Sequence, residues 1–93
     1  MRGDVVALSF PNRSRSFDSR KRCVRFWAHD ASFEVPFFVA ADALSRIDPE
    51  ATADESGMLS AFDLNRDLIF AAAERAYARD RRGSYMLSAA DMG

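Results

Sequence analysis

An alternation of apolar and polar side chains, at residues 21–29 and again at residues 32–39, constrains this fold more than any other feature. The apolar residues that recur at every second position are Val24, Phe26, Ala28, Phe33, Val35, Phe37 and Val39. Period-two alternation is typical of strands that bury one face. A tight turn at Asp30-Ala31 would pair residue 28 with 33, 26 with 35 and 24 with 37, and would put the whole apolar set on one face. Because a slip of one residue would destroy that match, the pattern predicts a β-hairpin in this register.

The opposite face of this hairpin is the first candidate for a binding surface. It carries Arg25, Trp27, Glu34, Pro36 and Phe38, and the expected register makes Trp27 and Glu34 cross-strand neighbours. Pro36 has no N–H donor, so we expect it at an edge or a bulge of the sheet. If a helix covers the apolar face, Trp27 and Phe38 need a cover of their own, and an exposed aromatic patch usually marks an interface. The alternative is that the preceding loop or a short helix of the same chain covers them.

The other segments predict an α+β domain. The expected elements are a strand at residues 4–10, a loop at 11–20, a short helix at 41–47, a long helix at about 53–81 and a last strand at 84–87. The order β-β-β-α-α-β predicts a single domain over residues 1–93. In it, a two-layer arrangement packs one long helix on one face of a mainly antiparallel sheet.

Local signals set the ends of the long helix. Thr52 and Glu55 have the spacing of a capping box at its start, and Gly83 suits the left-handed stop position after its end. Ser88 is placed to cap a last short turn. The apolar stripe that the helix would turn toward the sheet consists of Met58, Leu59, Phe62, Ile69, Ala73, Ala76 and Tyr77.

The single cysteine, Cys23, rules out a disulfide within the chain. A chain of 93 residues without disulfides is typical of the cytoplasm. The first residues have no apolar run long enough for a signal peptide, and no stretch approaches the roughly 20 apolar residues of a membrane span. The sequence therefore predicts a cytoplasmic protein without a membrane segment.

Charge is segregated along the chain, although the net charge is only −1. Residues 13–25 are basic and residues 30–67 are acidic, a distribution that can steer an acidic partner or let two copies attract each other. The candidate nucleic-acid-binding residues are Arg13, Arg15, Arg20, Lys21 and Arg22. They would contact phosphates while Phe17 or Trp27 stacks on bases. A sequence pI of about 5.7 and the lack of a recognised nucleic-acid motif argue against this role.

Catalytic and metal-binding chemistry finds little support in the spacing of residues. Cys23 and His29 lie six residues apart on one expected strand, about 20 Å from each other, whereas a nucleophile and its base must meet within about 3 Å. One histidine and one cysteine cannot build a zinc tetrad. The acidic residues 48–55 lack the glycine of a calcium loop, and no nucleotide or hydrolase signature occurs. We therefore expect no catalytic residue, no metal site and no cofactor.

The leading hypothesis is a non-enzymatic domain that binds protein, either another chain or a second copy of itself in a homodimer. Its candidate interface residues are Trp27, Phe38, Arg25 and Glu34. Nucleic-acid binding through the basic segment is the alternative. The weakest hypothesis is a small enzyme that uses only carboxylates and a tyrosine, for which the candidates are Asp18, Asp91 and Tyr85.

A series of short pieces along nearly the whole chain carries a resemblance to a known family. The pieces are Phe10-Pro11-Asn12, Phe17-Asp18, Val24-Arg25-Phe26-Trp27, His29-Asp30, Glu34-Val35, Phe37-Phe38, Ala43-Leu44, Phe62, Arg66, Ile69, Tyr77 and Tyr85-x-Leu87-Ser88 with Asp91. In this order they resemble the family called domain of unknown function 1488, a group of short bacterial proteins. The resemblance implies a small bacterial α+β protein, and it implies no activity and no catalytic residues, because the family has none assigned.

Overall fold

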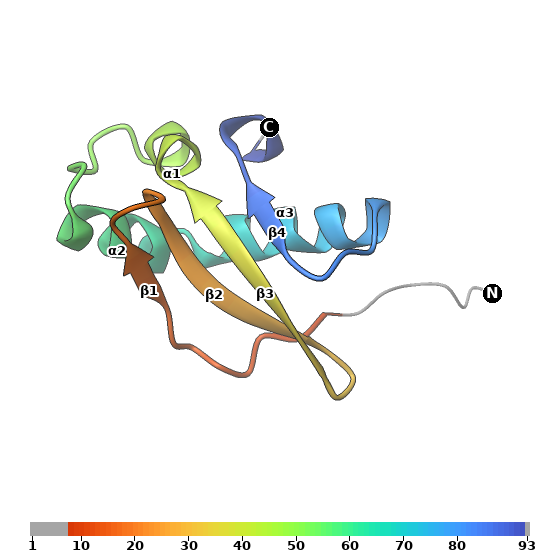
Figure 1. The fold of residues 1–93 in the computed structure, drawn as a ribbon. Coiled ribbons are helices and arrows are strands. Elements are labelled where there is room, and N and C mark those ends of the chain that lie inside the picture. The colour runs from red at the N-terminus through yellow and green to blue at the C-terminus, as the bar shows by residue number, and fades with distance from the viewer. Residues whose placement is uncertain (1–7, 93) are drawn as a thin grey trace.

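A four-stranded sheet forms one layer of the structure, a computed structural model that describes residues 8–92 (Figure 1). The strands are β1 (Ser16–Asp18), β2 (Cys23–Asp30), β3 (Phe33–Ala40) and β4 (Tyr85–Leu87), in that order across the sheet. The first three are antiparallel to their neighbours, and β4 is parallel to β3. The predicted α+β class with a mainly antiparallel sheet is thus confirmed.

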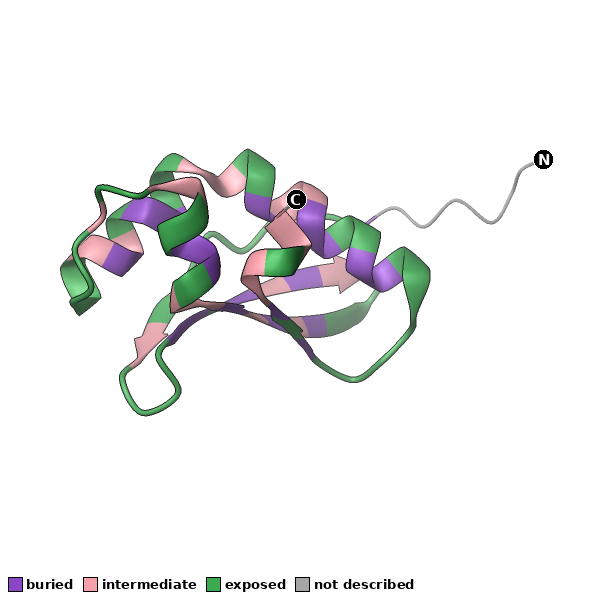
Figure 2. Cartoon of the chain, turned by 90° about the horizontal axis from the view of Figure 1, so that it is seen from above, coloured by how far each residue is buried: buried purple, intermediate pink, exposed green. Residues whose placement is uncertain are grey.

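The helices lie together on one side of this sheet (Figure 2). They are α1 (Ala41–Ile47), α2 (Glu55–Leu64), α3 (Arg66–Arg79) and the 3-10 helix η1 (Ala89–Met92). The short helix α1 has the bounds that the sequence predicted. The expected long helix occupies its expected range, but it is divided into α2 and α3.

Asn65 divides the long helix. Its backbone leaves the helical region, and its side-chain amide donates to the carbonyl of Ala61 at 2.9 Å. An asparagine that bonds to nearby backbone in this way competes with the helical hydrogen bonds. Its own N–H donates to the Phe62 carbonyl, one residue closer than an α-helix requires.

The helix ends differ from the predicted ones. Asp54, and not Thr52, caps α2: its carboxylate accepts from the Gly57 N–H at 2.9 Å and from the Thr52 hydroxyl at 2.7 Å. A Cβ on Gly57 would collide with the Thr52 backbone, so this tight entry needs a glycine. At the other end α3 stops at Arg79, before Gly83, because Asp80 is already extended.

The hairpin forms, but its predicted register was wrong by two residues. Residue 28 pairs with 35, 26 with 37 and 24 with 39. The turn is centred on residues 31–32, where Ala31 adopts a φ of 56°, and Asp30 therefore still pairs with Phe33. Because a shift of two residues preserves the side-chain period, the predicted apolar face survives, apart from Phe33, which is 73% exposed at the hairpin tip.

The segment before the hairpin also differs from the prediction. Residues 4–7 of the expected first strand lie outside the described residues, and Ser9 forms an isolated bridge with His29 through hydrogen bonds of 2.9 and 2.8 Å. Within residues 11–20, expected as a loop, Ser16–Asp18 form β1 against β2. Three residues bounded by turn formers carry too little pattern to predict a strand.

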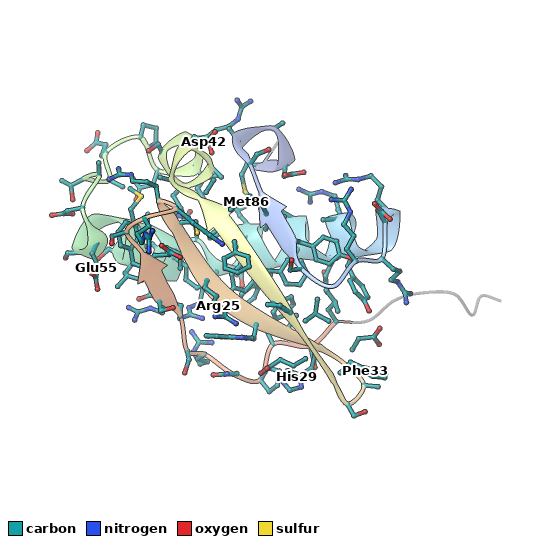
Figure 3. The ribbon with its side chains drawn as sticks, viewed as in Figure 1. Arg25, His29, Phe33, Asp42, Glu55 and Met86 are labelled. Carbon is teal, nitrogen blue, oxygen red and sulfur yellow. The ribbon has the colours of Figure 1, made fainter. Side chains whose placement is uncertain are left out.

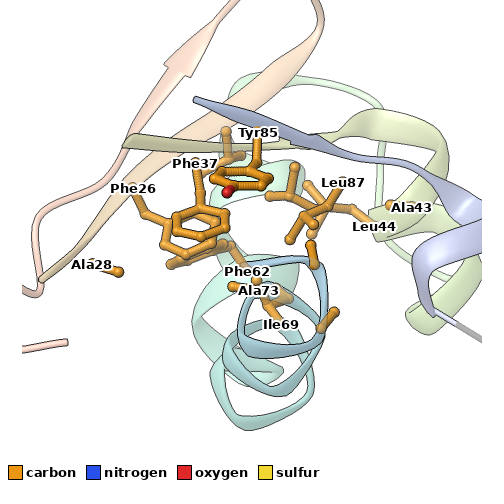
Figure 4. Packing of buried hydrophobic residues seen from close by; sticks show 14 of the residues in the cluster. Phe26, Ala28, Phe37, Ala43, Leu44, Phe62, Ile69, Ala73, Tyr85 and Leu87 are labelled. Atoms are coloured by element: carbon orange, nitrogen blue, oxygen red, sulfur yellow. The ribbon is translucent and has the colours of Figure 1, made fainter. Parts of the chain in front are cut away.

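The core lies between the sheet and the helices and is built around aromatic rings (Figure 4). The ring of Phe26 lies 5.4 Å from that of Phe37 and 5.1 Å from that of Phe62, and Tyr85 stacks on Phe37 at 4.9 Å. Ile69 of α3 is fully buried beside them. Each such side chain contributes several kcal/mol of burial, roughly 3–5 on truncation to alanine, so this layer determines the stability of the fold.

Candidate functional site

The face of the sheet turned away from the helices, here called the outer face, is the candidate site. Because side chains alternate along strands, its members follow from the register. They include Arg25, Trp27 and His29 of β2, Glu34, Pro36 and Phe38 of β3, and Met86 of β4. Figure 3 looks onto this face, with Arg25 and Met86 on either side of β3 and His29 toward the hairpin tip.

No helix among residues 8–92 lies over the outer face (Figure 2). Trp27, Pro36 and Phe38 are half-buried, and Met86 is 49% exposed. The short helix that was considered as a cover lies on the opposite side, and the preceding loop runs along the β1 edge (Figure 1). Aromatic and apolar groups therefore remain accessible on this face.

Cationic side chains, and not a helix, shield the aromatic rings of the outer face. The guanidinium of Arg25 lies 5.0 Å from the ring centre of Trp27 and 5.7 Å from that of Phe38, and the ammonium of Lys21 lies 5.6 Å from the Phe38 ring. Such cation–π contacts are worth about 0.5–1 kcal/mol each at exposed sites. Within residues 8–92 neither cation forms an ion pair with a carboxylate.

The actual register changes the neighbours on this face. Trp27 lies opposite Pro36 and not, as expected, opposite Glu34. Glu34 instead faces His29, with 3.9 Å between its carboxylate and the imidazole Nε2. Pro36 lies at an edge, as expected. The first residue of β4 pairs with Phe37, so no strand lies beside Pro36 on the β4 side.

The basic segment is distributed over three places. Arg15 bonds to Asp63 at 2.7 Å, beside the junction of α2 and α3, and this hydrogen bond holds the pKa of Asp63 below its usual value. Arg13 lines a cleft at the same junction, and Arg22 donates to the Ala53 carbonyl at 3.2 Å. Of the other nucleic-acid candidates, Arg20 is exposed in the β1–β2 turn and Lys21 lies on the outer face.

The three residues considered for an enzyme are not assembled. Tyr85 and Asp91 line a cleft of about 390 Å³ at the end of α3, whereas Asp18 lies on β1, at the far edge of the sheet. Hydrogen bonds from the N–H and hydroxyl of Ser88 lower the pKa of Asp91. The Tyr85 hydroxyl accepts from the Arg82 N–H and donates to the Asp80 carbonyl. Both groups are thus engaged in structural bonds.

The thiol and imidazole also remain apart. Cys23 opens β2 and is buried, and burial raises the pKa of its thiol, which disfavours the reactive thiolate. His29 lies toward the other end of the same strand. Among residues 8–92 no group of three or more His, Cys, Asp or Glu is placed to hold a metal ion.

Sequence reasoning missed Met86 and the position of Lys21. Met86 stands between two buried residues of β4, and this alternation was the only signal for its outward direction. Met86 lies opposite Phe38 because β3 and β4 pair in parallel, and these two strands are distant in the sequence.

Comparisons with known proteins bear on the fold. A family model described as protein of unknown function (DUF1488) matches residues 8–88. The chain also resembles a crystal structure of a protein of unknown function from the DUF1488 family of Shewanella loihica PV-4. The TM-score is 0.76 at 17% sequence identity, over 94% of this chain and 96% of that one. The comparison with curated proteins gives no match.

Among residues 8–92, no helix combines the length and the apolar character that a membrane crossing requires.

Proposed function

We propose that this chain, which belongs to the DUF1488 family of proteins of unknown function, is a binding domain rather than an enzyme, and that it binds protein on its outer face. One observation carries the proposal. Half-buried aromatic rings lie on a sheet face that no described helix covers, beneath the side chains of Arg25 and Lys21, which form no ion pair within residues 8–92.

The chemistry of the outer face suits a protein partner. Protein interfaces combine aromatic residues, methionine and arginine at their centre with a polar rim, and tryptophan and arginine often dominate their energetics. The partner surface would supply an apolar contact for Trp27, Phe38 and Met86 and a carboxylate for Arg25. When that carboxylate arrives, the cation–π contacts can persist while the charge is neutralised.

Nucleic acid is the second candidate, because cations above aromatic rings also suit phosphates and bases. The internal bonds of Arg15 and Arg22 weigh against it. Lys21 and Arg25 would then carry most of the phosphate contacts, and affinity would fall steeply with salt.

The cytoplasm is the proposed location. The only cysteine is free and buried, and small proteins of oxidising compartments usually depend on disulfides.

Site-specific photo-crosslinking tests the protein-binding role. A benzophenone side chain replaces Phe38 in the living cell, and the matched control replaces Leu64, which is 78% exposed on α2. We expect a discrete protease-sensitive adduct from position 38 and none from position 64. Adducts that nuclease removes, or equal labelling from both positions, would contradict the proposal.

A further inference from the structure

We infer that the outer face binds a second copy of this chain, packed face to face with its hairpin running in the opposite direction. This inference rests on the proposed function and names its partner. It follows from how charge is arranged along the β2–β3 hairpin.

The outer face has a basic end, an apolar middle and an acidic end. Arg25 lies opposite Phe38 at the basic end, where Lys21 adds a second cation. Trp27 lies opposite Pro36 in the middle, and Glu34 lies opposite His29 toward the hairpin tip. Glu34 pairs with His29, which lies four residues after Arg25 on β2, so the two charged ends are about 13 Å apart along the strands.

Asp18 on β1 carries a carboxylate near the basic end, since it pairs with Cys23, two residues before Arg25. It accepts hydrogen bonds from the backbone N–H groups of Arg20 and Lys21, which lower its pKa and hold it in the turn. Arg25 forms no ion pair within residues 8–92. The basic end therefore keeps a cation that no carboxylate of the described residues pairs with.

A twofold axis that lies in the plane between two such faces gives Arg25 a carboxylate partner for one relative direction of the two hairpins. If the hairpins ran in the same direction, the Arg25 and Lys21 ends of the two copies would coincide and repel. If the axis crosses the strands at the level of Trp27, the hairpins run oppositely and each Arg25 lies at the level of the other copy's His29 and Glu34. Glu34 is then one strand to the side, about 4.8 Å away, which a long arginine side chain can span. In an isologous contact each pair forms twice, so one charge pattern supplies two ion pairs.

The apolar groups are placed where such an interface needs them. Trp27 and Pro36 lie midway between the charged ends and would meet their own counterparts at the axis. Phe38 and Met86 flank them on β3 and β4. An apolar centre with charges at its rim is the usual anatomy of a specific interface.

Sedimentation equilibrium with charge reversal tests the inference, because Arg25 and Glu34 are exposed and their replacement leaves the core intact. We expect the wild type to dimerise. Arg25→Glu or Glu34→Arg alone should raise the dimer Kd by about tenfold, since two exposed ion pairs at up to about 1 kcal/mol each are lost.

Two combinations should restore dimerisation: the double variant, and an equimolar mixture of the single variants. In the mixed dimer the carboxylate introduced by Arg25→Glu meets the guanidinium introduced by Glu34→Arg on the other copy, while the second pair is native. The matched control is Arg46→Glu, an exposed charge reversal on α1, which should leave the Kd unchanged.

A wild type that stays monomeric at every concentration would overturn the inference, and so would a dimer that both single reversals leave intact. If the chain is monomeric while position 38 still crosslinks to a different protein, the second copy is excluded and the proposed function stands. If the chain is monomeric and position 38 yields no protein adduct, both fail.

Discussion

The two faces of the β2–β3 hairpin show how one alternating sequence can do two different things. On the inner face Phe26 is 1% exposed and contacts other aromatic rings within 5.4 Å. On the outer face Trp27, the next residue, is half-buried and has the Arg25 guanidinium above it. Helices cover the inner rings, whereas a cationic side chain lies over the outer ones. The inner face therefore holds the fold together, and the outer face remains available for contact.

Truncation of matched phenylalanines should give the largest difference between the faces. Phe26→Ala should lower the free energy of unfolding by about 3–5 kcal/mol, because it leaves a cavity among packed rings. Phe38→Ala, on the outer face, should lower it by less than about 1 kcal/mol. Urea denaturation followed by circular dichroism measures both, and equal losses would remove the distinction.

Loss of the hydrogen bonds between Ser88 and Asp91, at the rim of the helical layer, should lower the free energy of unfolding by an amount between these two values. Hydrogen bonds from Ser88 lower the pKa of Asp91, so the carboxylate stabilises the fold above its unfolded pKa of about 3.9 and loses this effect as the pH falls through the lower folded value. Asp91→Ala should cost about 1 kcal/mol at pH 7, the usual size of a lost cap. The difference from wild type should shrink as the pH falls below about 3.9. Urea titrations from pH 7 downward measure it, and a deficit that acidification leaves unchanged would contradict this role.

Removal of the Arg25 side chain should change the free energy of unfolding less than these substitutions, but it should expose the indole of Trp27. Arg25→Ala removes a cation–π contact worth about 0.5–1 kcal/mol at an exposed site. Acrylamide should then quench the fluorescence of Trp27, the single tryptophan, more strongly than in the wild type. Unchanged quenching would mean that something other than Arg25 shields the ring.

A substitution at the hairpin tip should give the smallest change in stability. Phe33 is 73% exposed although it continues the inner apolar set, so Phe33→Ser should change the free energy of unfolding by no more than about 0.5 kcal/mol. Thermal unfolding measures it. A loss comparable to that of Phe26→Ala would show that the tip belongs to the core.

Side-chain alternation was enough to predict which residues of the hairpin face each side, because the period of two survives any even shift in register. It could not place the turn, since Ala31 adopts a positive φ that its residue type does not announce. The break of the long helix at Asn65 was equally hidden, because an asparagine is tolerated within many helices and only its bond to Ala61 shows the competition.

For the candidate site, the sequence predicted that Trp27, Phe38, Arg25 and Glu34 share one face, and the structure places them there. It did not predict which of them are neighbours, because that depends on the turn. Nor did it predict Lys21 or Met86, which reach the outer face through the β1–β2 turn and the parallel pairing of β4. Such long-range placement leaves no local trace in the sequence.

The fluorescence of Trp27 across a dilution series shows whether the outer face closes against a second copy, because this indole lies at the centre of the outer face. If the outer face closes against a second copy, emission should be blue-shifted at high protein concentration. It should move to longer wavelength on dilution, over the range in which sedimentation shows dissociation. An emission maximum that does not change with concentration would mean that the outer face does not close against a second copy.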